Sequence, residues 1–242
     1  MAQSRKVTTQ QRGRALPRNN SRRMPLFFII LALVILVGIG AIVFLVNQRP
    51  KSNVAVVPFT PRAINVPTGT TPEGFAFMGK ADAPVTVIEY GDFQCPSCGA
   101  FATQQEAVFT QRYVDSGQVR FIYHDFPLPQ HANAVNAAAA ARAAGEQGKF
   151  WQMHELLFAR QRLWSESTNV VPLLQSYADA LGLDRTAFDQ ALSSNKFVPV
   201  LEAARQQSEQ RGVNATPTFE VNGKLVDAGT LEAAVQAALQ GK

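Results

Sequence analysis

Residues 84–98 have the sequence PVTVIEYGDFQCPSC, and this stretch decides the fold. Its first half, residues 85–90, is a run of β-branched and aromatic residues between Pro84 and Gly91, which is typical of a buried strand. Its second half carries two cysteines separated by two residues, directly before a helical pattern. The stretch therefore predicts a strand that brings a cysteine pair to the start of a helix.

The flanking sequence predicts how this strand continues into a domain. Hydrophobic periodicity and turn residues predict a helix over 98–114, a strand over 119–123, a helical block over about 131–210, a hairpin over 218–227 and a helix over 231–239. Within the helical block, Gly182 and Asp184 are typical of one helix end and the next helix start. The order predicts an α/β fold in which a helical insertion separates a β-α-β unit from a β-β-α unit.

The segment Cys95-Pro96-Ser97-Cys98 is the candidate for chemistry. At a helix N-terminus, free backbone N–H groups and the helix dipole stabilise a thiolate, which is the reactive form of cysteine. Pro96 suits the first helical turn because it has no N–H to leave unpaired. Cys98 lies one turn further on, within reach of a disulfide. We therefore expect a redox-active pair in which Cys95 is the nucleophile.

Other uses of two cysteines are less favoured. A c-type haem site requires histidine directly after the second cysteine, and Gly99 occupies that position. A zinc site requires two more ligands, and His124, His131 and His154 form no pair at metal-binding spacing. A purely structural disulfide that closes so short a loop gains little stability. Redox chemistry is favoured, and we expect no metal ion and no cofactor.

Residues 25–46 (PLFFIILALVILVGIGAIVFLV) are 22 residues without a charge. About 20 such residues in a helix cross a bilayer, whereas the apolar part of a cleavable signal peptide has only about 7 to 15. A buried core helix would have to be apolar on every face. The segment therefore predicts a transmembrane helix that acts as an uncleaved signal-anchor.

The charge distribution predicts the orientation of this helix. Seven Lys/Arg precede it, and only Arg49 and Lys51 follow closely. By the positive-inside rule the N-terminus is cytoplasmic, which places the rest of the protein outside the cytoplasm on a single-pass cell-membrane anchor. From residue 52 onward, 14 bases face 18 acids, so the sequence does not indicate a nucleic-acid-binding body.

We expect four segments along the chain. They are a basic cytoplasmic tail over 1–24, the transmembrane helix over 25–46, a tether over 47–74 and a folded domain over 75–242. The tether is expected because Pro50, Pro58, Pro61 and Pro67 occur there among polar residues.

Several motifs together resemble the DsbA-type thiol:disulfide oxidoreductases, especially their membrane-anchored, thioredoxin-like bacterial branch. They are the stretch up to Cys98, the Phe126-Pro127-Leu128 segment, an alanine-rich helix, Phe150-Trp151 and the sequence ATPTF over 215–219. The resemblance extends from about Phe75 to the C-terminus. It implies a thioredoxin-like fold with a helical insertion.

The resemblance also implies roles for three residues outside the cysteine motif. Thr216-Pro217 would be a cis peptide bond that faces the cysteines, although base rates alone favour trans. The Thr216 backbone would bind an incoming peptide. Glu89 would accept the proton of the second thiol; the alternative is a carboxylate at the solvent-facing end of its strand.

Three other residues modify these expectations. His124 and His131 flank the Phe126-Pro127-Leu128 segment, and we expect structural rather than catalytic roles for them. Ser97 stands where the best-known members of the family have histidine. Because serine adds no positive charge, we expect an oxidant of moderate strength.

The expected function is the introduction of disulfide bonds into exported proteins. A substrate thiolate would attack Cys95, a second substrate thiol would resolve the mixed disulfide, and a membrane redox partner would reoxidise Cys95 and Cys98. One alternative is a disulfide reductase or isomerase of the same fold. The other is a membrane-anchored binding module without catalytic activity.

Overall fold

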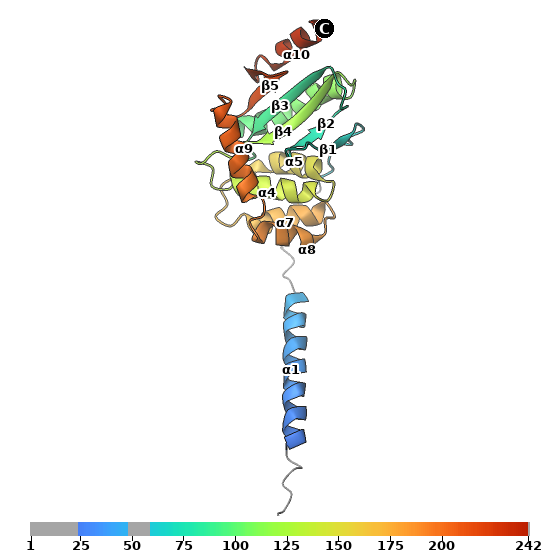
Figure 1. Ribbon diagram of the computed structural model, residues 1–242, viewed down its shortest axis with the longest axis vertical. Helices are drawn as coiled ribbons and strands as arrows, with labels where there is room; N and C mark the ends of the chain where they lie inside the picture. Colours follow the sequence, from blue (N-terminus) through green and yellow to red (C-terminus); the bar gives the residue numbers. More distant parts are fainter. Residues whose placement is uncertain (1–23, 48–58, 242) are drawn as a thin grey trace, which may run out of the picture. The chain divides into compact units, whose positions relative to one another are not determined.

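A computed structural model describes residues 24–47 and 59–241 of a chain that divides into two units after Lys51 (Figure 1). In the first unit, helix α1 (Met24–Asn47) covers residues 25–46, where the sequence predicts a transmembrane helix, and its membrane-spanning role stays a prediction. The side chains described in it, those of 26–41 and 44, are all exposed. Counted over the described residues, no helix is both long and apolar enough to cross a membrane. The predicted tail up to residue 23 and the tether over 48–58 lie outside the described residues.

The second unit is built on a six-stranded sheet. Its strands are β1 (Thr68–Thr70), β2 (Ala76–Met78), β3 (Val85–Gly91), β4 (Val119–Asp125), β5 (Thr218–Val221) and β6 (Lys224–Asp227), in the order β1-β2-β4-β3-β5-β6. The β3 and β4 strands are parallel, and every other neighbouring pair is antiparallel. The strand that leads to the cysteine pair, β3, therefore lies inside the sheet, between β4 and β5.

Helices follow in the predicted order. They are α2 (Pro96–Gln104), α3 (Glu106–Phe109), the π-helix η1 (Thr110–Val114), α4 (Ala134–Gly145), α5 (Phe150–Ala159), α6 (Gln161–Trp164), α7 (Val171–Ala180), α8 (Arg185–Ser193), α9 (Val198–Gln210) and α10 (Leu231–Gln240). The single helix expected over 98–114 is thus three segments. Gln105, with φ −123°, separates α2 from α3, and the helix changes from the α to the π type at Thr110, whose carbonyl accepts from Asp115 N at 2.9 Å. Helices α4, α5, α7 and α8 gather on one side of the strands (Figure 1).

The two faces of the sheet bury different side chains. One face carries Val85, Val87 and Glu89 of β3 beside Tyr123 and Phe219 of the neighbouring strands, and it belongs to the main hydrophobic core. The opposite face carries a smaller cluster formed by Tyr90, Phe126 and Val213. Because side chains alternate along a strand, the acid in β3 points into the main core rather than toward solvent.

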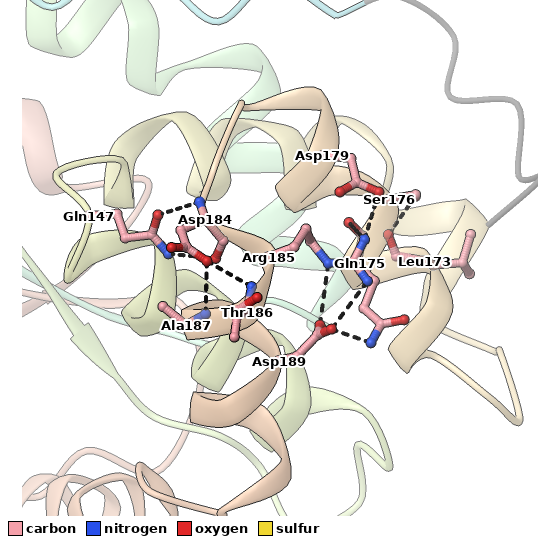
Figure 2. A network of polar contacts seen from close by, with 10 residues as sticks. All are labelled: Gln147, Leu173, Gln175, Ser176, Asp179, Asp184, Arg185, Thr186, Ala187 and Asp189. Carbon is pink, nitrogen blue, oxygen red and sulfur yellow. Dashed lines mark hydrogen bonds and ion pairs between the residues drawn. The ribbon is translucent and has the colours of Figure 1, made fainter. Parts of the chain in front are cut away.

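The junction between α7 and α8 confirms the turn chemistry expected there. Gly182 has φ +67°, and the Asp184 side chain caps α8 by accepting from the backbone N–H groups of Thr186 and Ala187. Figure 2 shows the Gln147 side chain beside Asp184. The backbone N–H of Asp184 donates to Gln147 Oε1 at 2.8 Å. Arg185 pairs with Asp179 and Asp189 in the same network.

The predicted tether is wrong over residues 59–74. Phe59, Ile64 and Val66 are half-buried against the main core, and residues 68–70 form β1 on the edge of the sheet. Arg62 also pairs with Glu155 of α5, at 3.2 Å. All three β1 residues are exposed, so the sequence has no alternating pattern to predict this strand.

Candidate active site

Helix α2 begins at Pro96 and places Cys95 at the N-cap position, as the sequence predicts. Cys95 has the extended backbone of an N-cap, and its carbonyl accepts from Gly99 N at 3.0 Å. Both cysteines are free thiols. Cys95 retains 7% of its surface exposed and Cys98 none, so only the first thiol borders on solvent.

The pKa values of the two thiols are shifted in opposite directions. The pKa of Cys95 is lowered to about 5, chiefly by the hydrogen bond from Cys98 and further by the backbone N–H groups of Cys98 and Ser97, against the opposing effect of burial. The pKa of Cys98 is raised well above its usual value by burial, by its hydrogen bond to Cys95 and by the charge of Glu89. At neutral pH the reduced pair therefore holds one thiolate, on Cys95.

Glu89 lies in β3, six residues before Cys95, and none of its surface is exposed. Neither of its carboxylate oxygens has a hydrogen-bond partner among the described residues. Burial raises its pKa well above the usual value, and the charges of Glu106 and Cys95 raise it further. The alternative of a solvent-facing strand end is therefore wrong, while its role as proton acceptor stays a prediction.

The Thr216-Pro217 bond is cis, which confirms the geometry that the family resemblance implies. Cys95 Sγ lies 3.4 Å from the Thr216 carbonyl oxygen, so this bond faces the cysteine pair across the site. The placement leaves the Thr216 backbone next to the nucleophile. Peptide binding by Thr216 and Pro217 remains a prediction.

Asp92 is a buried site residue that the sequence reasoning missed. Its backbone N–H donates to Cys98 Sγ at 3.5 Å, and its Oδ2 accepts from Leu128 N at 2.9 Å. The same oxygen lies 2.7 Å from His131 Nδ1. Asp92 thus connects the second cysteine to the Phe126-Pro127-Leu128 segment, and an acid directly after a buried strand was the available signal. The structural role expected of His131 stays a prediction.

Gln161 of α6 is a second residue that the sequence reasoning missed. Its side-chain N–H group donates to the carbonyls of Phe93 and Cys95, at 2.7 and 2.9 Å. A Cβ on residue 99 would lie 2.6 Å from Gln161 Oε1. The Gln161 amide therefore fits only because residue 99 is a glycine. No sequence signal marks Gln161, because it reaches the site only through the packing of the helical insertion.

His124 belongs to the other face of the sheet. Its ring stacks on Phe75 at 3.7 Å, and burial lowers its pKa to about 4. These contacts agree with the structural role expected for it. Among the described residues, no group of three or more His, Cys, Asp or Glu could hold a metal ion.

Comparison with known proteins places this geometry in a family. A family model described as Thioredoxin matches residues 70–240. The chain is similar to the Na(+)/H(+) antiporter NhaA 3 of Salinispora tropica, with 40% identity over 147 residues, 60% of this chain and 21% of the antiporter. The match thus spans about a fifth of that much longer protein, so its name says little about the matched part.

Two further comparisons cover most of the relative's own length. Disulfide bond formation protein D of Bacillus subtilis is 27% identical over 176 residues, 70% of this chain and 79% of that protein. The crystal structure of oxidised BdbD from Bacillus subtilis superposes with a TM-score of 0.63 at 27% identity, covering 73% of this chain and 99% of that one. The family model matches more than half of this chain, which shows that the chain belongs to the thioredoxin family.

Proposed function

We propose that the protein is a membrane-anchored oxidase that introduces disulfide bonds into exported proteins through Cys95 and Cys98. The observation that carries the proposal is that the pKa of Cys95 is lowered to about 5 while the pKa of Cys98 is raised. Stabilising the Cys95 thiolate stabilises the reduced form of the pair, and a dithiol with a stabilised reduced form is an oxidant. Ser97 adds no positive charge, which supports moderate rather than extreme oxidising strength.

The reaction starts from the Cys95–Cys98 disulfide. A substrate thiolate attacks Cys95 Sγ and breaks the bond to Cys98, which leaves as a thiolate and takes up a proton. The resulting mixed disulfide lies beside the cis Thr216-Pro217 bond, because the Thr216 carbonyl oxygen is next to Cys95 Sγ. A second substrate thiolate then attacks the substrate sulfur, and Cys95 leaves as a stable thiolate. Two electrons have passed from the substrate to the cysteine pair.

The membrane part of the proposal is supported by the sequence. The 22 uncharged residues over 25–46 and the excess of basic residues before them favour a single-pass anchor with a cytoplasmic N-terminus and an extracytoplasmic site. A site tethered to the membrane also suits reoxidation by a membrane redox partner. Separation of membranes from soluble material, with and without residues 25–46, tests the anchor.

The experiment that tests the function uses the oxidised protein and a reduced peptide with two cysteines. We expect the peptide to gain a disulfide while the protein gains two thiols, and Cys95→Ser to abolish the reaction. Cys98→Ser should stop at a mixed disulfide that is visible by mass. The redox potential against glutathione then decides the direction. A value near that of strongly reducing thioredoxins would replace the oxidase with a reductase, and inert cysteines would favour a binding module.

A further inference from the structure

A row of buried polar atoms lies behind the cysteine pair and is not used by the reaction described above. Both carboxylate oxygens of Glu89, the Tyr123 hydroxyl, both ring nitrogens of His154 and Glu106 Oε2 are buried, and none has a hydrogen-bond partner among the described residues. Buried polar groups are normally paired, and each unpaired one is costly. Four such residues in one region of the core require an explanation.

Tyr123 is the neighbour of Glu89 on the active-site side. The two residues are register partners on the parallel strands β3 and β4, so their side chains lie side by side on one face. A Cβ on residue 91 would lie 2.7 Å from Tyr123 Oη, which places the hydroxyl at Gly91. The next residue, Asp92, donates its backbone N–H to Cys98 Sγ. The hydroxyl therefore lies close to the buried thiol.

His154 and Glu106 continue the row away from the cysteines. The His154 ring packs edge-on against the Tyr123 ring, with 4.9 Å between centroids. On its other side, His154 Nε2 is 3.7 Å from Glu106 Oε2, a distance that a buried water or a small movement would close. His154 and Glu106 come from α5 and α3, so this part of the row exists only because these helices pack together.

The row ends at a cavity of about 440 Å³ that is lined by Glu106, His154, Arg62 and Glu155, among others. The Arg62 and Glu155 side chains, which are 30% and 19% exposed, form an ion pair at this cavity. Glu89 and Cys98 have no exposed surface at all. A proton on either of them needs a route through the protein, and this cavity is where the row of polar atoms reaches solvent-exposed side chains.

We propose that Tyr123, His154 and Glu106 form a proton pathway that connects Glu89 and Cys98 with the cavity at Arg62. The proposal rests on the thiol:disulfide chemistry of the previous section and adds residues to it. When Cys98 attacks a mixed disulfide on Cys95, its thiol proton passes to Glu89, the new Cys95–Cys98 bond forms and the bound thiol leaves as a thiolate. The proton on Glu89 then travels along the row and leaves at the cavity. In the opposite direction, Cys98 receives its proton by the same route.

The charges around the row suit this role. Burial lowers the pKa of His154 to about 3, so its imidazole is neutral at physiological pH and can accept a proton at one nitrogen while it releases one from the other. The pKa of Glu106 is raised to about 8 by burial and by Glu155, against the opposing effect of Arg62. Cys98, Cys95, Glu106 and Tyr123 are the titratable groups facing Glu89. The raised pKa values of Glu89 and Glu106 make their carboxylates stronger proton acceptors than exposed carboxylates are.

The test separates the two thiols in one experiment. The reduced protein is mixed with dithiodipyridine, whose thiopyridone product absorbs light. The first phase is attack by the Cys95 thiolate, and the second is attack by Cys98 on the mixed disulfide. In Glu106→Gln and His154→Phe we expect an unchanged first phase and a second phase slowed about tenfold, less than the ~10²–10⁴ typical of a direct proton acceptor. The solvent isotope effect of the second phase should rise in both variants.

Two further variants keep the test decisive. Tyr123→Phe keeps the ring and removes only the hydroxyl, so it should slow the second phase if the row passes through Oη. Glu232→Gln, in an exposed ion pair with Arg112, is the control and should change neither phase. A loss of packing would change the first phase or the near-ultraviolet spectrum as well. The pathway is overturned if Glu106→Gln and His154→Phe both keep a second phase within twofold of the unmodified protein.

The outcome also distinguishes the pathway from the function on which it rests. If the dithiol peptide is oxidised normally and the second phases are unchanged, the proposed oxidoreductase activity is supported and the proton pathway is rejected. A reduced protein that shows only the first phase would mean that Cys98 does not resolve the mixed disulfide, and both proposals would fail.

Discussion

Cys95 and Cys98 differ at the level of single residues because one is a helix N-cap and the other is sealed in the core. We predict that Cys95 alone is alkylated in a brief reaction of the reduced protein with limiting iodoacetamide. Its rate should stay nearly constant from pH 8 down to about pH 6 and fall as the pH passes through about 5, where the thiolate takes up its proton. Peptide mass mapping across this pH series is the measurement, and a label on Cys98 would contradict the assignment.

The same lowered pKa predicts how stability depends on redox state and pH. The thiolate contributes stability to the reduced protein because its folded pKa, about 5, lies below that of the unfolded chain. The contribution is lost as the pH falls through about 5 and is fully present only above the usual pKa of a cysteine, about 8.5. We expect the reduced form to melt above the oxidised form at neutral pH, and the gap in Tm to narrow steadily toward pH 5. A disulfide form that melts higher at pH 7 would argue for a reductive role.

At the scale of elements, α8 depends on one cap. The exposed Asp184 accepts from Thr186 N at 2.8 Å and Ala187 N at 3.1 Å, two of the N–H groups that a helix start leaves unpaired. Asp184→Ala should lower the free energy of unfolding by about 1 kcal/mol, whereas Asp184→Asn, which can still cap, should cost little. Urea unfolding of the three proteins measures the difference. Equal losses in both variants would mean that charge, not capping, makes the contribution.

At the scale of the whole molecule, the question is where the folded unit begins. Residues 59–74 bring Phe59, Ile64 and Val66 against the core, Arg62 to Glu155, and β1 to the sheet edge. We therefore predict that a fragment over 52–242 folds and forms the Cys95–Cys98 disulfide. A fragment over 75–242 should lose about 3 kcal/mol, given roughly 1 kcal/mol for each half-buried apolar side chain removed. Thermal unfolding of both fragments is the measurement. Equal stabilities would mean that residues 59–74 contribute nothing to the folded unit and belong to the predicted tether.

The sequence by itself determined the parts of this protein whose signals are local. The strand over 85–90, the helix start at Cys95, the cap at Asp184 and the hairpin at 222–223 each follow from short runs of residues and from backbone chemistry. The family motifs added the cis bond before Pro217, which local base rates do not favour. These features could be predicted because neighbouring residues suffice to favour them.

Only the tertiary structure decided which distant residues meet. Gln161 reaches the Cys95 carbonyl, Arg62 reaches Glu155, and the His154 ring packs on Tyr123 because helices and strands far apart in the sequence pack on one another. The depth of Glu89 was decided in the same way, since one strand pattern fits both a buried and a solvent-facing carboxylate. Burial and pairing depend on what covers a residue, and the covering residues lie elsewhere in the chain.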